Sequence, residues 1–182
     1  MSMAAIDLLI HPVRIRIVNA MSGGRKLTTA QLCARMPEMS QATVYRHVGM
    51  LADGGVLEVD SEQRVRGAIE RRYRLRQDRA LIDADAAATM SLDDHRRGFT
   101  AVMAALIAEF NSYLDRANAD PMADSVGYRQ FVLWLNDDEL AATIGDMRTL
   151  LIARMKNDPS PDRTPYLISP VLFPTEERAV KR

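Results

Sequence analysis

The sequence predicts a mainly α, α+β protein built from two parts, residues 1–78 and 79–182. Three observations lead to this prediction. Short apolar stripes of helical period fill most of the first part, and each ends near a glycine or a proline. A much longer stripe opens the second part. Two segments of the second part are rich in the β-branched and aromatic residues that favour strands. The second part is therefore expected to run helix, strand, helix, strand.

Four helices are predicted before residue 56, each bounded by residues that begin or end helices. Pro12 suits a first helical turn because that position needs no amide hydrogen. The Ser40 hydroxyl can cap the start of the fourth helix. Glycine pairs end the second and fourth helices. The expected helices cover about residues 4–10, 12–21, 29–36 and 41–53.

A two-stranded ribbon is predicted after the fourth helix. Residues 56–60 and 68–75 have strand character, and the polar, basic run SEQRVRG between them predicts a turn. Two short helices that are joined by a tight turn and followed by such a ribbon make a winged helix-turn-helix. We expect this fold for residues 1–78.

The start of the fourth helix is the candidate contact with DNA. Val44, Val48 and Leu51 form one inward stripe, which leaves most of the polar residues outward. Free amides at a helix start attract phosphate, and Tyr, Gln and Arg side chains can reach base edges in the major groove. A solvated helix face is the competing interpretation. The candidate residues are Ser40, Gln41, Ala42, Thr43, Tyr45 and Arg46.

The formal net charge of zero hides an asymmetry. Residues 1–79 contain 13 Lys and Arg against 8 Asp and Glu, whereas residues 80–182 contain 11 against 16. A basic first half suggests a polyanionic partner, although scatter of surface charge would give the same totals. Six arginines lie between residues 64 and 76, and some are expected to pair with acids across the ribbon. The candidate DNA contacts among them are Arg64, Arg66, Arg71 and Arg72.

Four sequence segments resemble those of a known family: HPVRIRIVNAM, LTTAQLCARM, SQATVYRHVGMLADGGVLEV and RGAIERRYRL. Together they make residues 5–76 similar to the ArsR-like winged helix-turn-helix regulators of bacteria and archaea. The resemblance implies that residues 41–46 open a recognition helix and that residues 64–72 form a wing. It also implies a homodimer that reads a pseudo-palindrome, with its recognition helices about one DNA turn apart.

The resemblance does not extend to metal sensing. Metal-sensing members place paired cysteines on or beside the DNA-binding helices, whereas this chain has a single cysteine, Cys33. We expect Cys33 to be a small buried apolar residue. The second half, YRQFVLWLNDDEL with TPYLISPVLFP, is similar to the C-terminal domain of uncharacterised regulators, which implies no defined ligand.

The second half is expected to form a dimerisation or sensing domain. A helix from Ser91 to about Ala117, a strand over 126–135, a helix over 136–156 and a strand over 166–173 are predicted. Its aromatic residues could build the core and a dimer interface, or could also line a pocket for a small apolar effector. The candidate pocket residues are Phe99, Met103, Phe110, Tyr128 and Trp134.

Catalytic and metal-binding functions find little support in the sequence. The three histidines and Cys33 lack zinc-site spacing, and His47 is expected to pack inward. The acidic groups Asp93-Asp94 and 137–139 open predicted helices, where carboxylates act as caps. No nucleotide-binding or nucleophile motif occurs. We therefore expect no enzymatic activity, no cofactor and no metal site.

The sequence as a whole predicts a sequence-specific transcriptional regulator. Its expected partners are double-stranded DNA, a second copy of the chain and, as a weaker hypothesis, a small-molecule effector. Neither a signal peptide nor an apolar run of the roughly 18 residues that span a membrane is recognised, so a cytoplasmic location is expected. The alternative is a winged-helix module that binds another protein and has no specific affinity for DNA.

Overall fold

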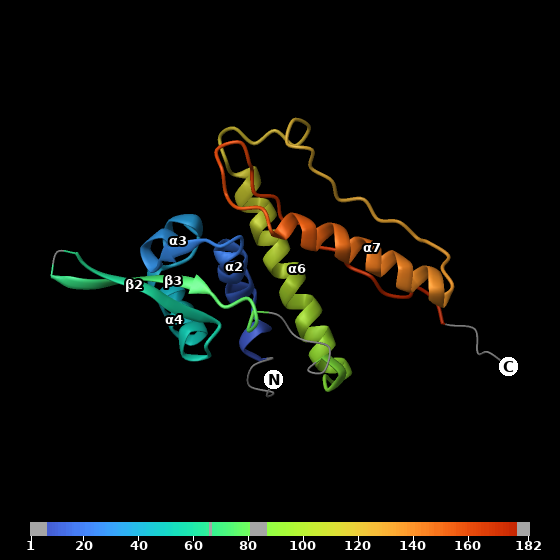
Figure 1. The fold of residues 1–182 in the computed structure, drawn as a ribbon, viewed down its shortest axis with the longest axis horizontal. Coiled ribbons are helices and arrows are strands. Elements are labelled where there is room, and N and C mark those ends of the chain that lie inside the picture. Colours follow the sequence, from blue (N-terminus) through green and yellow to red (C-terminus); the bar gives the residue numbers. More distant parts are fainter. Residues whose placement is uncertain (1–6, 66, 81–86, 178–182) are drawn as a thin grey trace.

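The computed structural model describes residues 7–65, 67–80 and 87–177 of the chain. Helices α2 to α4 and a small sheet form one end of the molecule, α6 lies beside α2, and α7 extends away at the other end (Figure 1). The elements are α2 (Pro12–Met21), β1 (Lys26–Thr28), α3 (Thr29–Arg35), α4 (Gln41–Asp53), β2 (Leu57–Val65), β3 (Ala68–Leu75), α6 (Leu92–Leu114) and α7 (Asp137–Met155).

The first helix predicted by the sequence lies at the edge of the described residues. Residues 4–6 of the expected helix 4–10 lie outside them, and residues 7–9 are helical. The predicted helices 12–21, 29–36 and 41–53 are confirmed as α2, α3 and α4, with α3 ending at Arg35. No helix within the described ranges is long and apolar enough to cross a membrane.

One apolar core holds α2, α3, α4 and the sheet together. The predicted stripe of Val44, Val48 and Leu51 on α4 is buried, as are Ile17 on α2 and Leu32 on α3. Burial of each such side chain contributes about 1.5–3 kcal/mol to stability. This core therefore fixes which side of α4 faces outward.

Capping groups determine where α3 and α4 begin and end. The Thr28 hydroxyl accepts a hydrogen bond from the Gln31 amide, while the Gln31 side chain accepts one from the Thr28 amide. At the end of α4, Gly55 has a φ of +70°, and its amide donates to the Ala52 carbonyl. The next amide, that of Val56, donates to the Leu51 carbonyl at 2.9 Å. These two bonds define a Schellman motif, which ends the helix at the predicted glycine pair.

The sheet is antiparallel, with strand order β1-β3-β2. The ribbon β2–β3 was predicted, but β2 continues to Val65, so the expected turn over residues 61–67 is largely strand. Strand β1 was not predicted because three residues are too few to show a period of two. Tyr73 on β3 pairs with Leu27 and Val59, and this register attaches the ribbon to the core.

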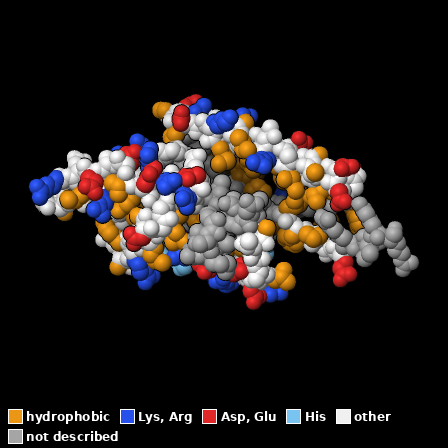
Figure 2. All heavy atoms as spheres, turned by 60° about the horizontal axis from the view of Figure 1, so that its bottom comes forward, with side chains coloured by type: hydrophobic (Ala, Val, Ile, Leu, Met, Phe, Trp, Pro, Cys, Tyr) orange, Lys and Arg blue, Asp and Glu red, His pale blue; other side chains and the backbone are white. Residues whose placement is uncertain are grey.

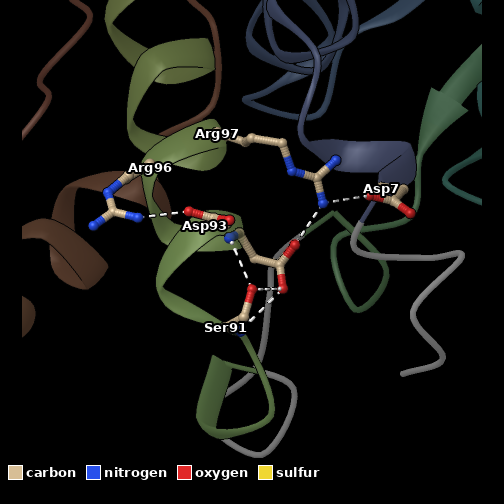
Figure 3. Close-up of polar contacts among 6 residues, drawn as sticks. Asp7, Ser91, Asp93, Arg96 and Arg97 are labelled. Carbon is tan, nitrogen blue, oxygen red and sulfur yellow. Dashed lines mark hydrogen bonds and ion pairs between the residues drawn. The ribbon is translucent and has the colours of Figure 1, made fainter.

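Helix α6 packs against α2 through small and charged side chains. Ala101 and Ala105 are its buried apolar residues, and their small size permits close approach of the two helices. The Ser91 and Asp94 side chains form a capping box at its start. Arg97 then connects Asp94, on the same helix, to Asp7 at 3.3 Å near the start of the chain (Figure 3). The helix ends at Leu114 rather than near Ala117.

The expected helix-strand-helix-strand order of the second half is wrong with respect to its strands. Helix α7 forms as predicted, but residues 126–135 and 166–173 contain no strand. In Figure 1 these two segments run on opposite sides of α7 and so do not lie next to each other. A strand requires a neighbouring main chain to hydrogen-bond with, and local propensity cannot supply one.

Candidate nucleic-acid interface

The start of α4 presents a polar, exposed face. Gln41, Ala42, Tyr45 and Arg46 are exposed, with Tyr45 at 54%. The structure thus brings together, on the outside of one helix, the amide, phenol and guanidinium groups that the sequence singled out. Such a face is suited to hydrogen bonds with phosphates and base edges.

Ser40 and Thr43 have structural bonds of their own at this helix start. The Ser40 Oγ accepts a hydrogen bond from the Thr43 amide at 3.2 Å and lies 2.8 Å from the Thr43 Oγ1. These contacts cap α4 and satisfy the Thr43 amide, whereas the Gln41 and Ala42 amides donate to no other described residue. The same hydroxyls still have lone pairs and a hydrogen for an outside partner.

His47 lies on the buried side of α4, behind the exposed polar face. It is buried, as predicted, and its ring lies 4.5 Å from the ring of His11. Burial, together with the charges of His11, Arg46 and Arg14, lowers the pKa of His47 to about 4. The ring is therefore neutral at pH 7, and its Nε2 lies 3.4 Å from a guanidinium nitrogen of Arg46. Because a guanidinium only donates, the neutral ring is the acceptor in this contact. This orienting role of His47 was not predicted.

A shallow groove of about 310 Å³ lies between α3 and α4, next to the polar face. Gln41 and Tyr45 form one wall, and Cys33 is among the residues of the other. Ala30 and Ala34, four positions apart on α3, also line it. Sequence reasoning missed these two residues, although their small size and helical spacing are the signal for such a groove.

The hairpin β2–β3 carries the predicted basic residues in two settings. Arg64, Arg71 and Arg72 are exposed, and Arg66 lies outside the described residues. Arg71 forms a 2.8 Å ion pair with Glu62, whereas no ion pair joins Arg64 or Arg72 to another described residue. Cross-strand register places Arg64 opposite Ile69 and Arg72 opposite Ser61. Lys and Arg side chains gather at this end of the molecule (Figure 2, left).

The predicted pairing of hairpin arginines with acids is confirmed in two cases. Besides Arg71 with Glu62, Arg74 binds Glu58 at 2.8 Å. Lys26 of β1 binds Asp60 at 2.9 Å. Both arginine pairs cross from β3 to β2, so they neutralise part of the basic ribbon and stiffen it by small amounts.

The candidate effector residues are only partly brought together. Phe110 on α6 meets Tyr128 edge-on, with ring centroids 6.3 Å apart. Trp134, in contrast, is 85% exposed, and Phe99 is half exposed. A nearby hollow of about 490 Å³ is lined by Pro121, Met122, Ser125, Val126, Gly127 and Arg129, none of them a candidate.

The acidic groups of the second half act at helix starts, as predicted. The Asp94 carboxylate accepts hydrogen bonds from the Ser91 amide and hydroxyl, which lowers the pKa of Asp94 to about 2. Glu139 accepts one from the Asn136 amide at 2.9 Å. Within the described ranges, no group of three His, Cys, Asp or Glu side chains is arranged to hold a metal ion.

The comparison with known families agrees with this geometry. Residues 9–60 match the sequence model of a family described as a helix-turn-helix domain. This segment contains α2, α3 and α4 and reaches into β2. The N-terminal segment is a helix-turn-helix domain. Such a domain indicates DNA binding and a regulatory role. No curated protein matches the chain.

Proposed function

We propose that the protein is a sequence-specific transcriptional regulator of the ArsR-like type that binds DNA as a homodimer. The observation that carries the proposal is the exposed polar start of α4, with Gln41, Tyr45 and Arg46 outward and the apolar stripe buried. The proposed action takes place on DNA in the cytoplasm and includes no catalytic step, cofactor or metal ion.

In the proposed complex, α4 enters the major groove by its first turns. Arg46 and Gln41 bind base edges, and Tyr45 binds a base edge or a phosphate. Ala42 keeps the helix slim at the point of entry. The Arg64 and Arg72 side chains, which have no ion pair within the described residues, bind the backbone or a narrow minor groove. Two copies would place their α4 helices one DNA turn apart.

The proposal is tested by selecting DNA from the source genome with the purified protein. We expect the retained fragments to share an inverted repeat, with an affinity at least about a thousandfold above that for bulk DNA near 150 mM salt. Weak retention without a motif, lost steeply as salt rises, would indicate phosphate attraction alone. That result would favour the alternative, a winged-helix module that binds another protein.

A pair of variants tests the assignment of the contacts. Replacing Tyr45→Ala and Arg46→Ala together removes two contacts of about 1–3 kcal/mol each, so specific affinity should fall by a hundredfold or more. The fold should persist because both side chains are exposed. Arg96→Ala, at an arginine of α6 whose side chain is 73% exposed, is the matched control and should bind DNA like the wild type. Unchanged binding of the double variant would overturn the assignment.

Control by a small apolar effector is a second part of the proposal. The edge-on contact of Phe110 with Tyr128 supports an aromatic site between α6 and the segment that follows it. An effector must change both the melting temperature and the affinity for DNA, because the two equilibria are linked. A compound screen read out by both measurements tests this part.

A further inference from the structure

The end of the molecule that contains α7 exposes an unusually apolar surface. No residue of α7 is buried. Segments 126–135 and 164–173 beside it contain one charged residue, Arg129, and expose Phe131 at 76% and Trp134 at 85%. Apolar side chains also gather over this half of the molecule in Figure 2 (right). The exposed large apolar residues of this C-terminal surface are Met122, Tyr128, Phe131, Val132, Leu133, Trp134, Leu135, Ile144, Met147, Leu150, Ile152, Met155, Tyr166, Leu167, Ile168, Val171, Leu172 and Phe173.

The C-terminal surface is far larger than a single soluble chain normally leaves in water. At about 150–250 Å² for each aromatic side chain and less for the others, it amounts to roughly 2,000 Å². This area is a sum over α7 and the two segments on its opposite sides, whereas the largest single apolar patch of a typical monomer is about 300–600 Å². A stable protein–protein interface needs only about 800 Å² from each partner. The area is thus sufficient for an extensive interface.

The main chain of the two segments also lacks a partner. Both have the composition of strands. Within the described residues their one backbone hydrogen bond to another part of the chain is local, from the Val126 amide to the Pro121 carbonyl of the preceding turn, and none pairs them with a strand. Extended apolar chain with free amides and carbonyls is a template for pairing with another chain. A second copy brings the same two segments and can therefore provide the missing strand partners.

Helix α7 is complementary in charge to a reversed copy of itself. Asp138 and Lys156 are 18 positions apart, which is five turns at about 100° per residue, so they lie on one side of the helix at its opposite ends. Between them, on the same side, lie Ala142, Gly145 and Thr149, and a methyl group added at Gly145 would meet no atom within 4 Å. An antiparallel twin would set Asp138 against Lys156 twice, across a close contact of small side chains.

From these observations we infer that a second copy of the chain covers the C-terminal surface, with the two α7 helices antiparallel. Segments 126–135 and 164–173 of each copy then pair with segments of the other. The inference rests on the proposed function, which requires two copies so that two recognition helices reach the DNA. It deepens that proposal because it names the surface that joins the two copies.

Sedimentation equilibrium of the full-length protein tests the interface. We expect the wild type to be a dimer at micromolar concentration. Phe131→Glu with Trp134→Glu should shift it to monomer, with a dissociation constant raised at least a hundredfold. Ile69→Glu, at an exposed apolar residue of the hairpin, is the matched control and should remain dimeric. A monomeric wild type at 100 µM, or a double variant that stays dimeric, would overturn the inference.

A charge exchange tests the antiparallel arrangement. Asp138→Lys or Lys156→Asp alone should weaken the dimer about tenfold, since each places like charges together twice. Mixing the two single variants should restore association, because every facing pair is then opposite in sign. Restored association supports the arrangement, whereas singles that match the wild type, or a mixture no tighter than either single, contradict it.

The same samples distinguish failure of this inference from failure of the proposed function. A monomer that still retains a specific DNA motif would refute the interface and leave the DNA-binding proposal intact. A dimer that retains no DNA motif would refute the DNA-binding proposal and leave the interface intact. Circular dichroism of each variant establishes that a change in mass is not caused by unfolding.

Discussion

Arg16 on α2 and Glu109 on α6 form a 2.8 Å ion pair that joins the helix-turn-helix domain to the long helix of the second half. The Arg16 side chain is almost fully buried, and the same guanidinium also binds Glu38, which lies between α3 and α4, and the Ser112 hydroxyl. One side chain therefore connects α2, the turn that precedes α4, and α6.

Replacing Arg16 should lower the stability of the protein by weakening the contact between α2 and α6. We expect Arg16→Met to lower the free energy of unfolding by about 2 kcal/mol, because it leaves the carboxylates of Glu109 and Glu38 without their cation. Urea unfolding followed by circular dichroism measures the change. Arg79→Met, at an exposed arginine with a 3.8 Å ion pair, should alter stability by less than about 0.5 kcal/mol. Equal midpoints for the two variants would contradict this account.

Stability should fall as the pH drops from about 6.5 towards 4. His47 has a pKa of about 4 in the folded protein, below its ordinary value of 6.5. His47 therefore binds a proton more readily in the unfolded chain than in the folded protein. The free energy of unfolding is highest above pH 6.5 and falls between pH 6.5 and 4, by up to about 3 kcal/mol. The lowered pKa of His11 acts in the same direction.

Urea titrations at several pH values measure this dependence. The slope of unfolding free energy against pH should become smaller in His47→Gln. The matched variant His95→Gln, at an exposed histidine on α6, should keep the slope of the wild type. A His47→Gln protein with an unchanged slope would show that another group is responsible.

Removing the charge of Glu62 should increase affinity for DNA. Glu62 neutralises Arg71 in the free protein, and both side chains are about half exposed. Glu62→Gln leaves the Arg71 guanidinium free to bind a DNA phosphate, so we expect severalfold tighter binding. The slope of log affinity against log salt concentration should become steeper by the amount that corresponds to about one more phosphate contact. Stability should change little because exposed ion pairs contribute at most about 1 kcal/mol.

Fluorescence anisotropy with labelled duplex at several salt concentrations measures both quantities. Glu176→Gln, which removes one negative charge far along the sequence, controls for net charge. Equal gains in the two variants would mean that overall charge, rather than release of Arg71, determines affinity.

Two glycines, one inside α4 and one just after its end, should respond to alanine with opposite signs. Gly55 has a φ of +70°, which an alanine adopts at a cost of about 1–2 kcal/mol. Gly49 lies inside the helix, and an added methyl group there meets no atom within 4 Å. Gly49→Ala should therefore stabilise the protein by about 0.5–1 kcal/mol, and Gly55→Ala should destabilise it. Thermal unfolding of both variants measures the pair, and a change of the same sign in both would be inconsistent with the helix end described above.

Local signals predicted most of the helix-turn-helix domain and its candidate contacts. The Ser40 cap, the Val44 stripe and the Gly54-Gly55 end specify α4 and its outward face, because each acts within a few residues. The role of His47 as an acceptor for Arg46 depends on burial by α2, and the neutralisation of Arg71 by Glu62 depends on strand register. The sequence predicted that some hairpin arginines pair with acids but not which partner each takes, and it gave no sign of the role of His47.

The sequence by itself determined the helices, most of their ends and the polar start of α4, since capping, periodicity and backbone preference are local properties. Tertiary structure alone decided that β1 joins the sheet, that Arg16 connects α2 to α6, and that segments 126–135 and 166–173 remain unpaired. The physical reason is that hydrogen bonds between strands and buried ion pairs join residues far apart in the chain. Strand propensity states what a segment can do, but the available partner determines whether it becomes a strand.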